Sequence, residues 1–114
     1  MASLGELERQ VMDVLWRSDG PCAATELRDE LAGDPAITTV LTVLSRLEAK
    51  GFVTRDRAKR PHLFRAAMTR DDYMAELMHE VLGSAPDREA VLARFLGRVS
   101  KSETDHLRKL LGQG

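Results

Sequence analysis

The hydrophobic pattern of this chain changes at Gly51, from a helical period to a strand-like one. Before Gly51, apolar residues gather on one side of a helix, and these are Val40, Val43, Leu44 and Leu47. After Gly51, the runs Phe52 to Arg57 and His62 to Ala66 flank a polar, basic segment that contains a proline. We therefore expect a helix with Thr38 as its N-cap and Gly51 as its stop, followed by a β-hairpin.

Two further helices are predicted upstream. The first begins at Ser3, whose spacing to Glu6 fits a capping box, and it ends at Asp19-Gly20-Pro21. Its apolar residues at helical spacing are Leu4, Leu7, Val11, Val14 and Leu15. The second helix runs roughly from Ala24 to Leu31 and buries Ala24, Leu27 and Leu31. Three helices followed by a hairpin predict a winged helix-turn-helix domain over residues 1–68, in a fold class that is mainly α.

The last part of the chain, residues 69–114, is predicted to be a helical dimerisation domain. Thr69 can cap a first helix, a further helix starts near Asp87, and Ser100 with Glu103 has capping-box spacing for a third. Large apolar residues recur along these helices, but they are too few for more than a thin core. We therefore expect this segment to pair with its copy in a second chain. The residues expected at the homodimer interface are Met74, Leu77, Met78, Val81, Leu82, Phe95, Leu107, Leu110 and Leu111.

Positive charge is concentrated in the middle of the chain. The formal net charge is only -1, yet residues 46–70 hold eight basic and two acidic residues. The segments on either side carry an excess of acid. A run of charge is usually just a solvated face, but a basic segment within this order of elements indicates contact with phosphates.

The exposed side of the helix before Gly51 is predicted to read DNA. Threonines lie opposite the apolar stripe, and short side chains let a helix approach base edges closely, while an arginine on the same side can reach guanine or phosphate. In a winged helix-turn-helix this helix enters the major groove and the hairpin tip lies on the backbone. The predicted DNA-binding residues are Thr38, Thr39, Thr42, Arg46, Lys50, Arg57, Lys59 and Arg60.

Catalytic and metal-binding patterns are missing from the sequence. His62, His79 and His106 lack the spacing of a shared metal site, and no nucleophile motif or phosphate loop is present. The single cysteine, Cys22, cannot form an intramolecular disulfide and fits a reducing interior. No apolar run is as long as a membrane span. We expect a cytoplasmic protein that is not an enzyme, with no catalytic residues, no cofactor, no metal and no membrane partner.

Four segments match the pattern of a known family. They are LGELERQVMDVLW at 4–16, ITTVLTVLSRLEAKGFV at 37–53, the basic wing with Phe64, and SKSETDHLRKLL at 100–111. Together they resemble the BlaI/MecI family of penicillinase repressors. The resemblance implies a homodimeric transcriptional repressor that binds palindromic operators in double-stranded DNA. Several members are inactivated through a sensor-linked protease that cuts the dimerisation region, in the best-known cases next to an Asn-Phe pair. This sequence departs from that pattern, with Arg94-Phe95 as the nearest candidate, so the resemblance leaves release by proteolysis or by ligand binding open.

Two other functions are compatible with the residues alone. A winged helix can be a protein-interaction module that does not bind DNA, and the threonine face would then contact a protein; the basic segment argues against this. A ligand-sensing winged-helix regulator of another family would need an apolar pocket between the two domains. No aromatic-rich cluster in the sequence indicates such a pocket.

Overall fold

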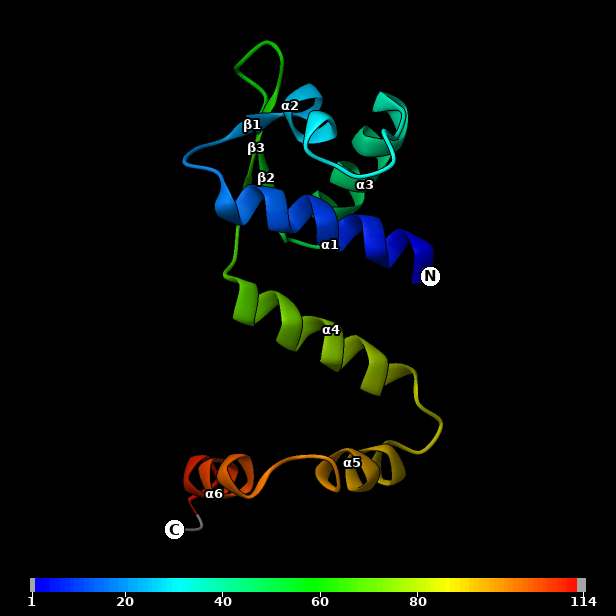
Figure 1. Ribbon diagram of the computed structural model, residues 1–114, viewed down its shortest axis with the longest axis vertical. Coiled ribbons are helices and arrows are strands. Elements are labelled where there is room, and N and C mark those ends of the chain that lie inside the picture. Colours follow the sequence, from blue (N-terminus) through cyan, green and yellow to red (C-terminus); the bar gives the residue numbers. More distant parts are fainter. Residues whose placement is uncertain (1, 113–114) are drawn as a thin grey trace. The chain divides into compact units, whose positions relative to one another are not determined.

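The computed structural model describes the backbone of residues 2–112 and the side chains of residues 5–112. Its elements, in chain order, are α1 (Ala2–Arg17), β1 (Cys22–Ala23), α2 (Ala24–Asp29), α3 (Ile37–Ala49), β2 (Val53–Asp56), β3 (Leu63–Ala66), α4 (Arg70–Ser84), α5 (Arg88–Leu96) and α6 (Lys101–Leu110) (Figure 1). The chain divides into two compact units, one up to Met74 and one from Ala75 onward. Because this division falls inside α4, the first turn of that helix belongs to the first unit.

The first unit is a winged helix-turn-helix, and the predicted fold class is confirmed. Its strands form an antiparallel sheet in the order β1-β3-β2, with Val53 opposite Ala66 and Cys22 opposite Phe64. Figure 1 shows the loop of the β2–β3 hairpin, the wing, projecting beyond the helices of this unit. The sequence analysis missed β1, because a strand of two residues is too short to show a period.

The core of the first unit is built around the predicted apolar stripe of α3. Val40, Val43, Leu44 and Leu47 are each 0% exposed. The predicted core residues of the two preceding helices are also buried, namely Val11, Val14, Leu15, Ala24, Leu27 and Leu31, whereas Leu7 is half-buried. Aromatic rings from the residue before β2, from β3 and from α4 complete the core: Phe52, Phe64 and Tyr73 are fully buried. Each large apolar side chain removed from water stabilises the fold by about 1.5 to 3 kcal/mol.

The two ends of α3 show one correct prediction and one wrong one. The N-cap is Ala36, whose carbonyl oxygen accepts the Val40 N–H at 3.1 Å, so Thr38 already lies inside the helix. Extended backbone at Ala36, next to Pro35, lets the helix start before the threonines, without a side-chain cap. The stop at Gly51 is confirmed. Gly51 has a φ of 83°, and the Phe52 N–H donates to the Leu47 carbonyl oxygen at 2.9 Å, as in a Schellman motif.

The remaining helix starts were predicted with mixed success. The backbone of α1 is helical from Ala2, one residue before Ser3; the side chains of Ser3 and Leu4, and with them the expected capping box, lie outside the described residues. The expected caps Thr69 and Ser100 of the second half are confirmed, and Asp87, predicted only as the approximate start of a helix, is also an N-cap. The Thr69 hydroxyl oxygen accepts the Asp72 N–H, the Asp87 carboxylate accepts the Ala90 N–H, and Ser100 forms a capping box with Glu103.

The second unit consists of helices without an internal core. None of residues 75–112 is buried, although several of them are large and apolar. The caps listed above are local interactions, so they can define where these helices begin without any packing. These helices therefore leave their large apolar side chains exposed or half-buried.

Candidate nucleic-acid interface

Residues of α3 form an exposed, uncharged surface that ends in an arginine. Thr38, Thr39, Thr42 and Arg46 are all exposed, on the side of the helix opposite the buried stripe. The Thr42 hydroxyl donates to the Thr38 carbonyl oxygen at 2.9 Å, which fixes its rotamer and leaves its oxygen as an acceptor. Arg46 makes no ion pair with any acid among the described residues. The structure thus brings these four predicted residues together on one accessible face.

The wing carries two more of the predicted cations. Lys59 and Arg60 lie in the loop between β2 and β3, and both are exposed. Arg60 Nη1 donates to the carbonyl oxygens of Arg57 and Lys59, so its guanidinium group lies against the loop backbone. At the start of the same loop, the Asp56 carboxylate accepts the Ala58 N–H at 3.0 Å. These bonds hold the side chains of Asp56 and Arg60 against the backbone of the loop.

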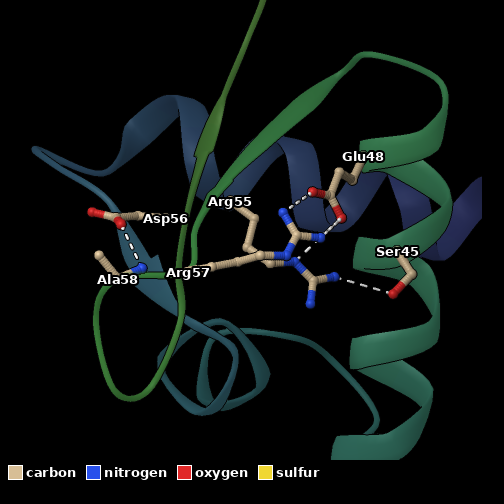
Figure 2. A network of polar contacts seen from close by, with 6 residues as sticks. All are labelled: Ser45, Glu48, Arg55, Asp56, Arg57 and Ala58. Carbon is tan, nitrogen blue, oxygen red and sulfur yellow. Dashed lines mark hydrogen bonds and ion pairs between the residues drawn. The ribbon is translucent and has the colours of Figure 1, made fainter.

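A carboxylate on α3 holds the wing to the helix. Figure 2 shows the guanidinium groups of Arg55 and Arg57 converging on Glu48. Arg57 Nη1 lies 2.8 Å from Glu48 Oε2, Arg57 Nη2 donates to Oε1 at 3.1 Å, and Arg55 Nε lies 3.2 Å from Oε1. Arg55 Nη2 also donates to Ser45 Oγ at 3.1 Å. The sequence analysis placed Arg57 on DNA and did not include Glu48 or Arg55 in the site.

The charge state of Glu48 follows from these partners. Hydrogen bonds from Arg57 lower the pKa of the Glu48 carboxyl group below its ordinary value, and the positive charges of Arg55 and Arg57 act in the same direction. Partial burial of the carboxyl group opposes this shift but does not reverse it. Glu48 is therefore ionised throughout the neutral range, and it offsets part of the positive charge of the wing.

Lys50 is placed differently from the other predicted DNA-binding residues. Its Nζ lies 3.4 Å from Oε1 of Glu8, whose side chain is only 4% exposed, and 5.9 Å from the centroid of the Phe52 ring. A buried carboxylate needs a partner, because leaving it alone away from water is costly. Lys50 thus joins the end of α3 to α1. Lys50 is nevertheless exposed, and its assignment to DNA stays a prediction.

Ion pairs reduce the basic footprint that was counted along the sequence. Lys50 pairs with Glu8, and Arg70 pairs with Asp13 at 2.7 Å. Arg55 and Arg57 share Glu48. Within the described part of the chain, the cations of this segment that have no acidic partner within 4.0 Å are Arg46, Lys59, Arg60 and Arg65. Three of these four belong to the predicted DNA-binding set.

The predicted dimerisation residues lie on α4, α5, α6 and the residue after α6, and none is buried. Met74, Met78, Val81, Phe95, Leu110 and Leu111 are exposed, whereas Leu77, Leu82 and Leu107 are half-buried. Val91, Leu92 and Leu96 on α5 are also exposed, and the sequence analysis did not assign them to the interface. The helical spacing of these three residues in the sequence could have identified them as part of the same apolar surface.

The described residues hold neither a membrane-spanning helix nor a grouped set of metal ligands. No helix within the described residues is long and apolar enough to cross a membrane. Between residues 2 and 112, no three His, Cys, Asp or Glu residues are grouped so that they could hold a metal ion.

Comparison with known proteins identifies the family. The penicillinase repressor family matches residues 4–113. The transcriptional regulators BlaI of two Mycobacterium tuberculosis strains, CDC 1551 and H37Rv, are each 39% identical over 118 residues, which cover 99% of this chain and 86% of theirs. The crystal structure of a Thermotoga maritima transcriptional regulator covers 90% of this chain and 72% of its own, at 27% identity and a TM-score of 0.43. The relatives are named as regulators, in agreement with the prediction of a protein that is not an enzyme. The chain belongs to the penicillinase repressor family.

Proposed function

We propose that this protein is a sequence-specific transcriptional repressor that acts as a homodimer on palindromic operators. The observation that carries the proposal is the exposed face of α3, where Thr38, Thr39, Thr42 and Arg46 stand beside a basic wing in a helix-turn-helix unit. Family membership supports the same reading. Because such a repressor acts where the chromosome is, the proposal includes a cytoplasmic location.

The chemistry of the α3 face suits the major groove. Residues near the start of a recognition helix reach base edges, and Thr38, Thr39 and Thr42 lie in the first two turns of α3. Threonine offers a methyl group to thymine and a hydroxyl to base edges, and the hydroxyl of Thr42, which already donates to the Thr38 carbonyl oxygen, is left as an acceptor. Arg46, one turn further on, can donate two hydrogen bonds to guanine. Lys59 and Arg60 supply contacts to phosphates, which add affinity but no sequence information.

Homodimerisation is supported by the absence of a core in residues 75–112. A monomer seldom exposes so many large apolar side chains on consecutive helices, because each costs free energy in water. A second copy of the same segment offers a matching surface in a two-fold arrangement. In such a dimer, once one DNA-binding unit has bound the first half-site, the other unit binds the second half-site at high effective concentration. This predicts operators that are inverted repeats.

The proposal also covers release from DNA by a sensor-linked protease. The bond between Arg94 and Phe95 lies in the last turns of α5, and Phe95 is exposed. Cleavage there would cut through the apolar segment assigned to the dimer. Loss of the dimer would then remove the gain from binding two half-sites.

The deciding experiment is selection of genomic DNA fragments by the full-length protein, followed by sequencing. We expect enrichment of fragments that share an inverted repeat, with affinity that falls steeply as salt rises. The variant Arg46→Ala should lose the enrichment. The matched control Arg98→Ala removes the same charge from the exposed turn after α5 and should keep the enrichment. Recovery of random fragments by the unchanged protein would contradict sequence-specific binding.

A further inference from the structure

Arg57 is not free to bind DNA in this structure, because both arms of its guanidinium group contact the two oxygens of Glu48. This fork-to-carboxylate geometry is the one that arginine also adopts with phosphate. An acidic group therefore occupies the position at Arg57 that a DNA phosphate would take. The contact lies beside the face of α3 that is proposed to read bases, since Ser45 belongs to the same network (Figure 2).

The two arginines on Glu48 differ in how firmly they are held. The Arg55 side chain is 14% exposed, bonds to Ser45, and lies over the ring of Phe64 at 4.8 Å. The Arg57 side chain is 60% exposed and has Glu48 as its acidic partner. Arg55 is thus part of the packing, whereas Arg57 can rotate away. If Arg57 leaves, Glu48 keeps Arg55 as a partner, so the exchange does not strand a charge in the partly buried site.

We propose that Glu48 is a specificity-determining residue of the DNA-binding surface, which withholds Arg57 from loosely bound DNA and yields it to a phosphate only when the duplex is seated on α3. The inference rests on the proposed function. On random DNA, contacts are electrostatic and shifting, and a phosphate must compete with an intramolecular carboxylate at high effective concentration. On the operator, the contacts of α3 hold one phosphate beside Arg57, and the exchange becomes favourable. Glu48 thereby lowers affinity for random DNA more than affinity for the operator.

The test compares Glu48→Gln with the unchanged full-length protein on two duplexes, a random-sequence duplex and the operator recovered by genomic selection. We expect the variant to bind the random duplex several-fold more tightly and the operator with a smaller gain. The specificity ratio then falls. The salt dependence on random DNA should steepen by about one charge per wing, because Arg57 becomes available there.

The matched control is Asp56→Asn. Asp56 is an exposed acid of the same wing whose carboxylate accepts the Ala58 N–H and contacts no arginine within 4.0 Å among the described residues. Asparagine keeps an acceptor oxygen at this position while removing the same charge. An equal gain for both variants would overturn the proposal, because it would show a general effect of charge. A loss of affinity in Glu48→Gln on both duplexes would also overturn it, by showing that Glu48 only positions the wing.

A double-mutant cycle tests whether the effect passes through Arg57. In the Arg57→Ala background, Glu48→Gln should no longer tighten binding to random DNA. A gain that persists without Arg57 would contradict the inference. Circular dichroism checks folding of each variant. If Glu48→Gln fails to fold, the variants Arg57→Ala and Lys59→Ala provide the test. Arg57→Ala should leave the affinity for random DNA unchanged and lower the affinity for the operator, whereas Lys59→Ala should lower both affinities. Equal effects of the two variants would overturn the proposal.

Failure of this inference is distinguishable from failure of the proposed function. If the unchanged protein binds no duplex at low salt, the repressor function itself is wrong. If it selects an operator but Glu48→Gln changes neither the random-DNA affinity nor the salt dependence, the function stands and the role of Glu48 is refuted.

Discussion

The indole Nε1–H of Trp16 donates a hydrogen bond of 2.9 Å to the carbonyl oxygen of Met68, which joins α1 to the segment that leads into α4. The ring of Tyr73, on the first turn of α4, forms T-shaped contacts with the rings of Trp16 and Phe52, at centroid distances of 5.3 Å and 5.0 Å. Arg70 lies over the indole at 4.8 Å and pairs with Asp13. The beginning of α4 is therefore part of the core of the DNA-binding unit.

Replacing Tyr73 should destabilise the DNA-binding unit. Tyr73 is 1% exposed, so Tyr73→Ala leaves a cavity among aromatic rings and should lower the free energy of unfolding by about 3 kcal/mol or more. Chemical denaturation at a fixed protein concentration measures this. Asp71→Ala, an exposed change in the same turn, should cost less than about 1 kcal/mol. A similar loss in the free energy of unfolding for Tyr73→Ala and Asp71→Ala would show that the first turn of α4 is not part of the core.

Removal of the Arg46 side chain should weaken operator binding by about 1 to 3 kcal/mol and relax base preference. The reason is its position on the exposed face of α3, one turn beyond Thr42 and without an acidic partner in the described chain. Titrations of Arg46→Ala on the operator and on a scrambled duplex measure the effect. Equal losses on the two duplexes would reassign Arg46 to a phosphate contact.

Each of the wing-tip substitutions Lys59→Ala and Arg60→Ala should weaken operator and scrambled DNA alike. Both side chains are exposed in the β2–β3 loop, where they meet phosphates rather than bases. The logarithmic salt dependence should flatten by roughly one charge per wing for each substitution. Binding measured over a salt series provides the check. An unchanged slope would remove the wing tip from the contact surface.

A fragment that ends at Met74 should fold as a monomer and bind one half-site weakly. Every buried residue of the described chain lies at or before Tyr73, so this fragment keeps the whole core, whereas one ending at Arg70 would lose Tyr73. Without residues 75–112 the fragment should lose most affinity for the full palindrome. Inserting about five base pairs between half-sites should harm the intact protein far more than the fragment. Sedimentation measures the oligomeric state of the fragment and the intact protein, and titrations measure their affinities. A monomeric full-length protein would refute the dimer.

The Glu48 network should make stability depend on pH in the acidic range. Because the pKa of Glu48 is lower in the folded than in the unfolded protein, its contribution to stability is present above the unfolded value of 4.5 and is lost as pH falls through the folded value. Thermal unfolding of the unchanged protein and Glu48→Gln should differ near neutral pH and converge in acid. Glu80→Gln, on exposed α4, serves as the control. A difference that stays constant with pH would exclude Glu48 as the source.

The elements that the sequence determined by itself rest on short-range patterns. The stripe of α3 was readable because Val40, Val43, Leu44 and Leu47 repeat at the period of a helix. Thr69 and Ser100 could be predicted as caps because each has a hydroxyl oxygen that can accept a backbone N–H three residues later, as both do in the structure. The order of helices and hairpin was sufficient for the fold class. The N-cap of α3 was the local failure, because a backbone start at Ala36 leaves no side-chain signal.

Only the tertiary structure decided which partners the charged residues of the site have. Arg57 forms an ion pair with Glu48, and Lys50 forms one with Glu8. Helical spacing and local charge had predicted only that both cations contact DNA. The sequence analysis also did not predict the pairing of β1 with β3 or the burial of Tyr73. Each of these contacts joins residues that are separate in the sequence, and their meeting depends on how the helices and the wing fold back on one another. A charge has the same formal value along the chain wherever it lies, whereas its availability to a ligand depends on the groups that surround it after folding.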